Sequence, residues 1–255
     1  MLKKQDFIEG ASKAMAVLEC FSAERQRLNA TQAAERTSMT RAAARRHLLT
    51  LQYLGYLEGE QGYFWLTPRV LRLAGIYLSS ARLPRAVQPT LDRLAADTEQ
   101  AFSVAVLDAA QIVIVARSGE HRRHSSVVPY GIHLGARLAA FATSTGRVLL
   151  ADLGLAEMRL LVQQGSLVAY TPKTIITKRA LFAEIARIKK QGYSEAIEEH
   201  EFGVRALAVP VRDARGKTIA ALNIVDSSQR SKVESLAVRY LETLVKASAE
   251  IRSLL

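Results

Sequence analysis

In residues 28–66 the hydrophobic positions are spaced first as in helices and then as in strands. Two helices are predicted, with a turn at residues 38–40 between them. In the second helix Ala44, Leu48 and Leu51 stand at i, i+4 and i+7, so they form one apolar stripe. A short hairpin pattern follows. This order of elements predicts a winged helix-turn-helix, a module whose second helix enters the major groove of DNA.

The predicted hairpin joins residues 56–58 to residues 63–66, which are rich in aromatic and apolar side chains. Gly59 and Gly62 stand in the connecting turn, where glycine supplies the positive φ that tight turns need. Trp65 is expected to pack under this wing rather than to stack on a base. The hairpin therefore supports the winged-helix interpretation.

The outer face of the second helix is polar and cationic. Thr40 is predicted to be its N-cap, because the hydroxyl can accept a hydrogen bond from a free amide of the first turn. Arginine suits guanine edges and phosphates through its forked donors. A solvated basic helix face is the alternative interpretation. The residues predicted to contact double-stranded DNA are Ser38, Thr40, Arg41, Ala42, Arg45, Arg46 and Thr50.

The chain changes character after the hairpin. Pro68 suits the first position of a helix, and residues 68–82 have an amphipathic helical pattern that should break at Leu83-Pro84. We therefore expect a DNA-binding domain at residues 1–67, a linker helix at 68–82 and an effector-binding domain at 83–255.

Hairpin patterns dominate the rest of the chain. The expected fold class is α+β, with a mostly antiparallel sheet that carries helices and can cup a small molecule. Strands are expected at residues 102–107, 111–116, 125–128, 193–197, 205–211 and 218–225, and helices at 85–98, 144–153, 155–164, 178–190 and 230–253.

Composition narrows the class of protein. The formal net charge of +11 is shared by both halves of the chain, so it predicts salt-sensitive attraction to polyanions without locating the contact. The single cysteine, Cys20, excludes an internal disulfide and is expected to be buried and inert. No apolar run is long enough for a membrane span, and the first residues lack the pattern of a signal peptide. A cytoplasmic location with no membrane contact is expected.

Taken together, several segments resemble the IclR family of transcriptional regulators along nearly the full length. Three further segments resemble the subgroup that senses protocatechuate or 4-hydroxybenzoate and controls aromatic-acid catabolism. The chain departs from that subgroup at Phe141-Ala142, where Tyr-Cys is usual, and at Ala139, where Pro is usual. The family segments are residues 41–48, 51–56, 63–67, 142–151 and 198–205 followed by 208–211, and the subgroup segments are 68–71 with 77–80, 115–118 and 135–141.

The resemblance implies a GAF-like effector domain and a homodimer or dimer of dimers on a two-fold-related operator. It also implies that an aromatic carboxylate changes the pose of the DNA-binding domains, which requires a different affinity for the two poses. Members of this subgroup are mostly activators, so activation is expected rather than repression.

The segment 140–146 is the predicted carboxylate site, because a loop that runs into a helix offers free amides and hydroxyls to an anion. Arg137 is expected to pair with the carboxylate, Phe141 and Tyr130 to pack on the ring, and Asn223 to reach a ring hydroxyl. The alternatives are a helix cap, a surface ion pair and a bond between strands. The predicted ligand residues are Arg137, Tyr130, Phe141, Ala142, Thr143, Ser144, Val204, Ala206 and Asn223.

The sequence signals for other kinds of site, such as metal or catalytic sites, are weaker. Residues 121–124 carry two histidines and two arginines, which we interpret as a solvated loop. Residues 198–201 combine carboxylates with an imidazole, but a metal site would need a further ligand, so they are interpreted as a turn bordering the pocket. No catalytic residue, metal or cofactor is predicted.

Three kinds of function remain open at this point. A ligand-responsive transcription factor is favoured, with a regulator of another pathway that senses a different organic acid as its variant. A hydrolase using Ser144 lacks the G-x-S-x-G pattern around that serine. A winged-helix module that binds protein instead of DNA would show no sequence preference in DNA titrations.

Overall fold

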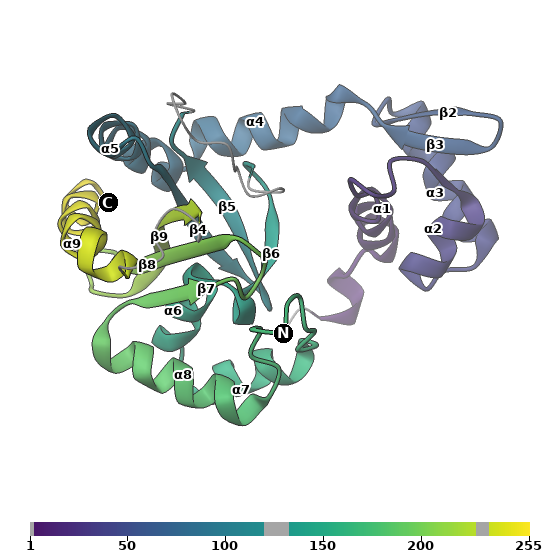
Figure 1. Ribbon diagram of the computed structural model, residues 1–255. Helices are drawn as coiled ribbons and strands as arrows, with labels where there is room; N and C mark the ends of the chain where they lie inside the picture. Colours follow the sequence, from purple (N-terminus) through teal and green to yellow (C-terminus); the bar gives the residue numbers. More distant parts are fainter. Residues whose placement is uncertain (1–2, 120–132, 228–234) are drawn as a thin grey trace. The chain divides into compact units, whose positions relative to one another are not determined.

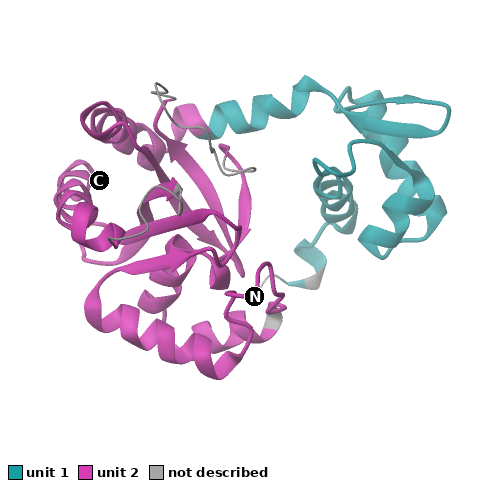
Figure 2. Cartoon of the chain, viewed as in Figure 1, with its two compact units in different colours: residues 1–77 teal, residues 78–255 magenta. Residues whose placement is uncertain are grey.

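The computed structural model describes residues 3–119, 133–227 and 235–255 (Figure 1). The chain divides into two compact units, Met1–Tyr77 and Leu78–Leu255 (Figure 2). The boundary falls within helix α4 (Leu71–Ser80), which begins directly after the short 3₁₀ helix η2 (Pro68–Val70). Among the described residues, the first unit has one hydrophobic core and the second has two.

The first unit is a winged helix-turn-helix, as the sequence predicts. Its sheet is antiparallel in the order β1-β3-β2, and β1 was not predicted. The stripe of Ala44, Leu48 and Leu51 is buried in the core, where it packs with residues of α1 and the wing. Its elements are η1 (Lys4–Asp6), α1 (Glu9–Glu19), β1 (Leu28–Asn29), α2 (Ala30–Thr37), α3 (Arg41–Tyr53), β2 (Leu57–Glu60) and β3 (Tyr63–Leu66).

The second unit is built on a six-stranded sheet in the order β6-β5-β4-β9-β8-β7, with every pair antiparallel. The edge strand β6 was not predicted, and the strand expected at 125–128 lies outside the described residues. The strands are β4 (Ala101–Asp108), β5 (Gln111–Arg117), β6 (Arg137–Ala139), β7 (Ser194–Ile197), β8 (Val204–Arg212) and β9 (Thr218–Ser227).

Helices cover both faces of this sheet (Figure 1). Helices α5 (Arg82–Thr98) and α9 (Leu236–Leu254) pack on one face. The 3₁₀ helix η3 (Ala140–Ala142) and helices α6 (Ser144–Asp152), α7 (Leu155–Gln164) and α8 (Lys178–Gln191) pack on the other. The sheet therefore separates two cores.

The break between α4 and α5 corrects one expectation. It falls at Ala81 rather than at Leu83-Pro84, because Pro84 lies in the first turn of α5, where its missing N–H is not needed for a helical hydrogen bond. Within the described ranges, no helix combines the length and the apolarity that crossing a membrane would require.

Candidate functional site

Helix α3 begins where the sequence predicts. The Ala43 amide donates to the Thr40 hydroxyl at 3.2 Å, so Thr40 caps the helix. Ser38 closes α2 in the left-handed region, with φ of 54°, and its amide donates to the Ala34 carbonyl. The turn between the two helices is thereby fixed by one hydroxyl cap and one left-handed residue.

The cationic face of α3 is open to solvent. Burial of its apolar stripe in the core turns the opposite side of the helix outward. No carboxylate among the described residues pairs with Arg41, Arg45 or Arg46, so their donors are available to a polyanion. The exposed set comprises Ser38, Thr40, Arg41, Ala42, Arg45, Arg46 and Thr50.

Trp65 is held on the wing by two contacts. Its indole nitrogen donates to Glu58 at 3.1 Å, and the Arg27 guanidinium lies 4.5 Å from the centre of its ring.

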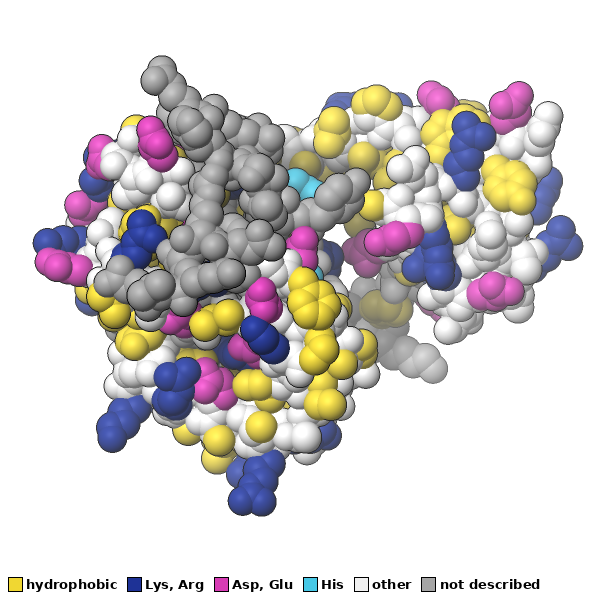
Figure 3. All heavy atoms as spheres, viewed as in Figure 1, with side chains coloured by type: hydrophobic (Ala, Val, Ile, Leu, Met, Phe, Trp, Pro, Cys, Tyr) yellow, Lys and Arg dark blue, Asp and Glu magenta, His cyan; other side chains and the backbone are white. Residues whose placement is uncertain are grey.

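On the face drawn in Figure 3, Lys and Arg side chains are spread over both units. The local arrangement of α3 is therefore more informative about DNA than the total charge.

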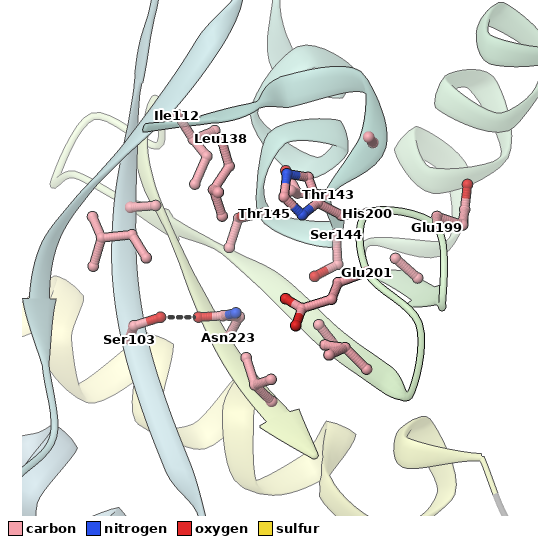
Figure 4. Close-up of a pocket in the computed structure, with 17 residues that line it drawn as sticks. Ser103, Ile112, Leu138, Thr143, Ser144, Thr145, Glu199, His200, Glu201 and Asn223 are labelled. Carbon is pink, nitrogen blue, oxygen red and sulfur yellow. Dashed lines mark hydrogen bonds between the residues drawn. The ribbon is translucent and has the colours of Figure 1, made fainter. Parts of the chain in front are cut away.

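The second unit contains a cavity of about 620 Å³, a volume that includes its open mouth. It lies on the sheet face that carries α6, and its walls are mostly apolar (Figure 4). The lining residues come from six strands, η3, the start of α6 and the segment between β7 and β8: Ser103, Ala105, Ile112, Ile114, Leu138, Ala142, Thr143, Ser144, Thr145, Ala196, Glu199, His200, Glu201, Val204, Ala206, Asn223 and Val225.

The first turn of α6 forms one polar wall. The Gly146 amide donates to the Thr143 hydroxyl at 3.1 Å, which caps the helix. Ser144 and Thr145 follow, and amides at these positions have no partner within a helix. Ser144 is 1% exposed, and its hydroxyl has no hydrogen-bond partner among the described residues. This wall therefore offers donors that the fold itself leaves unsatisfied.

Glycine at position 146 lets this wall form. A Cβ there would lie 2.2 Å from the carbonyl oxygen of Ala140, far inside van der Waals contact. The backbone of η3 consequently lies directly on the first turn of α6, which places Ala142 and Ser144 in the same cavity.

Strand register creates a second polar spot. Ser103 on β4 stands opposite Asn223 on β9, and its hydroxyl donates to the Asn223 side-chain oxygen at 2.5 Å. Figure 4 shows the Asn223 oxygen directed at Ser103 and its nitrogen on the other side of the carboxamide. Asn223 thus makes the bond between strands and also lines the cavity.

A buried arginine supports the segment between β7 and β8. Arg147 is 1% exposed; its Nε donates to the Phe141 carbonyl at 2.7 Å, and its Nη atoms form a two-pronged pair with Glu199. The Thr171 and Thr174 hydroxyls donate to the carbonyls of Glu198 and Glu199, each at 2.6 Å. These bonds hold the segment against the cavity.

His200 lies in this segment and stacks on Tyr170, with ring centres 4.7 Å apart and planes 25° apart. Burial lowers the pKa of His200 below its ordinary value. Burial therefore favours the neutral form of the ring. The segment predicted to border the pocket contributes three of its lining residues.

Six of the nine predicted ligand residues line the cavity: Ala142, Thr143, Ser144, Val204, Ala206 and Asn223. Tyr130, like residues 121–124, lies outside the described residues. Arg137 and Phe141 line a different groove, shared with Tyr170 and residues of α7.

The position of Arg137 corrects the predicted pairing with a ligand carboxylate. Successive side chains of a strand point to opposite faces, and Leu138 faces the cavity, so Arg137 faces away from it. Arg137 pairs instead with Asp108 at 2.6 Å and with Gln111 at 2.7 Å. This is the surface ion pair that the sequence left open as the alternative.

Sequence reasoning did not single out Arg147 or Ser103 as residues of the site. Arg147 carried a signal, because a cation within the apolar run of α6 needs a buried partner, but the partner is 52 residues away in the chain.

In the described part of the chain, no cluster of three His, Cys, Asp or Glu side chains is arranged to hold a metal ion.

An exposed cationic recognition helix in one unit and a small-molecule cavity in the other define a ligand-responsive DNA-binding regulator. The IclR helix-turn-helix domain matches residues 10–61, and the C-terminal domain of bacterial IclR transcriptional regulators matches residues 75–253. The chain belongs to the IclR family of bacterial transcriptional regulators.

Two relatives indicate which IclR regulators this chain is similar to. The chain is 45% identical to the Pca operon regulatory protein of Acinetobacter baylyi over 255 residues, which cover 100% of this chain and 92% of the relative. It is 44% identical to the p-hydroxybenzoate hydroxylase transcriptional activator of the same organism, covering 99% and 94%.

A solved structure similar to the second unit is a double mutant of the PobR inducer-binding domain from Acinetobacter in complex with 3-hydroxybenzoic acid. It has a TM-score of 0.63 and 39% identity, and the match covers 68% of this chain and 99% of that one. Sequence similarity therefore groups the chain with regulators of aromatic-acid catabolism, and its fold is that of the IclR family.

Proposed function

We propose that this protein regulates genes of aromatic-acid catabolism and that a small aromatic carboxylate, of the hydroxybenzoate or protocatechuate type, sets its regulatory state. The observation that carries the proposal is the buried, unpartnered Ser144 hydroxyl at the first turn of α6, within an otherwise apolar cavity. A buried polar group of this kind is satisfied when a ligand accepts from it.

The walls of the cavity match the parts of such a ligand. The carboxylate accepts from Ser144 and the free amides of α6, where the positive end of the helix dipole favours an anion. The ring packs on apolar residues of the sheet, such as Ile112 and Leu138. Asn223 and Ser103 supply hydrogen bonds for a ring hydroxyl. The names of the relatives support this class of effector.

On the DNA side, Arg45 and Arg46 are the proposed base or phosphate contacts, together with Ser38, Thr40, Arg41, Ala42 and Thr50. Two copies would place two α3 helices on successive half-sites of an operator, so the proposed state is a homodimer or a dimer of dimers. The proposed place of action is the cytoplasm, where bacterial operators are.

A thermal-shift series tests the effector. Protocatechuate, 4-hydroxybenzoate and 3-hydroxybenzoate should stabilise the protein, by about 2.7 kcal/mol at a hundredfold excess over Kd. Ser144→Ala should reduce this stabilisation, while Arg137→Ala, whose side chain points away from the cavity, should retain it. Stabilisation by aliphatic acids and not by aromatic acids would favour a regulator of another pathway.

Anisotropy titration against operator fragments tests the DNA contacts. Arg45→Ala or Arg46→Ala should weaken specific binding by about 1–3 kcal/mol if the side chain makes a bidentate base contact. Arg159→Ala is the matched control, because it removes an exposed arginine from α7 of the other unit. Equal loss in all three variants would indicate a general charge effect instead of recognition by α3.

The hydrolase alternative gains one element from the structure, because His200 shares the cavity with Ser144. It lacks the defining contact, since the described residues place no hydrogen-bond partner on the Ser144 hydroxyl. A nucleophilic serine needs a base within hydrogen-bond distance. The geometry therefore favours binding of an acid over turnover of an ester.

A further inference from the structure

We propose that His200 supplies the positive charge for the effector carboxylate and takes up a proton as the effector binds. This inference rests on the proposed function, because it requires an anionic effector in the cavity. It concerns a residue that the sequence did not single out as a ligand contact.

The charges around the cavity motivate the proposal. Its described lining includes two carboxylates, Glu199 and Glu201, and neither lysine nor arginine. Arg147 neutralises Glu199, whereas no cation among the described residues pairs with Glu201. An entering carboxylate therefore meets an uncompensated negative charge. In this described lining, His200 is the side chain that can become a cation.

The charged groups around His200 do not already supply a free positive charge to the cavity. Glu199 and Glu201 are its neighbours in the segment between β7 and β8, and α6 contributes Arg147, which is committed to Glu199. The segment packed against His200 contributes the phenol of Tyr170 and Lys173, and Lys173 pairs with Glu198 at 2.5 Å. The nearby cations are thus already matched to carboxylates.

The two states of the cavity then differ in the charge of one ring. In the ligand-free cavity, burial lowers the pKa of His200 and favours the neutral imidazole. An effector carboxylate in the same cavity favours the imidazolium and raises that pKa. Proton binding and effector binding therefore help each other, and this coupling is reciprocal.

Calorimetry on the full-length protein tests the coupling without a variant. Titration with 4-hydroxybenzoate at one pH, in two buffers of different ionisation enthalpy, should show net uptake of up to about one proton per site. The affinity should rise by up to about tenfold per pH unit as the pH falls through neutrality. The uncharged 4-hydroxybenzamide should bind without proton uptake.

Two variants then locate the proton. His200→Gln should abolish the uptake and flatten the dependence of Kd on pH, while uptake should persist in Glu201→Gln. The inference is overturned if wild-type protein binds the acid without proton uptake, or if Glu201→Gln removes the uptake and His200→Gln retains it. Failure of every aromatic carboxylate to bind at any pH would contradict the proposed function itself.

Discussion

Helices α3 and α6 start alike and serve opposite purposes. Each begins after a threonine whose hydroxyl accepts from the amide three residues on, Thr40 from Ala43 and Thr143 from Gly146. The arginines of α3 are exposed, whereas Arg147 of α6 is 1% exposed. The same capping chemistry thus presents cations to solvent in one unit and builds the wall of a cavity in the other.

The difference shows where a helix can be understood from its own sequence. Helix α3 has one buried and one solvated face, so its period reveals which residues face outward. In α6, every residue from Ser144 to Ala151 is buried. Its roles are set by contacts with distant segments, and the contrast can be tested by substitutions at matched positions.

The largest effect is expected at the arginines. Arg147→Leu should lower the free energy of unfolding by about 3–5 kcal/mol, because it leaves Glu199 buried without its partner. Arg46→Leu, on the exposed face of α3, should change it by no more than about 0.5 kcal/mol. Urea unfolding followed by circular dichroism measures both.

Trp65 sharpens that measurement, since the single tryptophan lies in the first unit. Its fluorescence transition should stay in place in Arg147→Leu while the circular-dichroism transition moves. Replacing both partners, Arg147→Leu with Glu199→Leu, should restore part of the loss. Equal sensitivity at Arg147 and Arg46 would refute the distinction between the two helices.

A somewhat smaller effect is expected at the third position of each helix. Gly146→Ala should cost about 3 kcal/mol, the upper range for overpacking, because the new Cβ meets backbone that cannot move aside. The reciprocal change, Ala43→Gly, should cost about 1 kcal/mol through helix propensity alone. Thermal denaturation compares the two, and a tolerated Gly146→Ala would disprove the close approach of η3.

A smaller effect on stability is expected from the two N-cap threonines, and it should be similar for both. Thr40→Ala and Thr143→Ala should each cost about 1 kcal/mol, the usual value for an N-cap. Only the second should also weaken effector binding, because Thr143 lines the cavity. Unfolding curves and ligand titrations on the same two proteins check this, and matched losses of affinity would count against it.

The smallest effect is a dependence of stability on pH. The pKa of His200 in the folded protein is lowered by burial from its ordinary value of 6.5. The native state therefore binds fewer protons, and the contribution of this residue is present above 6.5 and lost as the pH falls through the folded pKa. His200→Gln should lessen the decline in melting temperature between about pH 7.5 and pH 5.5. An identical decline in both proteins would assign it to other groups.

The sequence predicted the winged helix and the antiparallel sheet because periodicity and turn residues are local signals. The residues of the effector cavity were harder to predict from the sequence. Leu138 enters the cavity and Arg137 does not, a choice made by the register of β6, a strand of three residues that periodicity could not reveal. Arg147 and Glu199 meet across the fold, and no local pattern encodes that pairing.

The exposure of α4 has a further consequence. None of its residues is buried, and the described hydrophobic clusters of both units lie outside it. An inserted residue would lengthen the helix by about 1.5 Å and leave the packing of those clusters unchanged. Variation in the length of α4 among related chains is therefore expected to spare the folding of either unit.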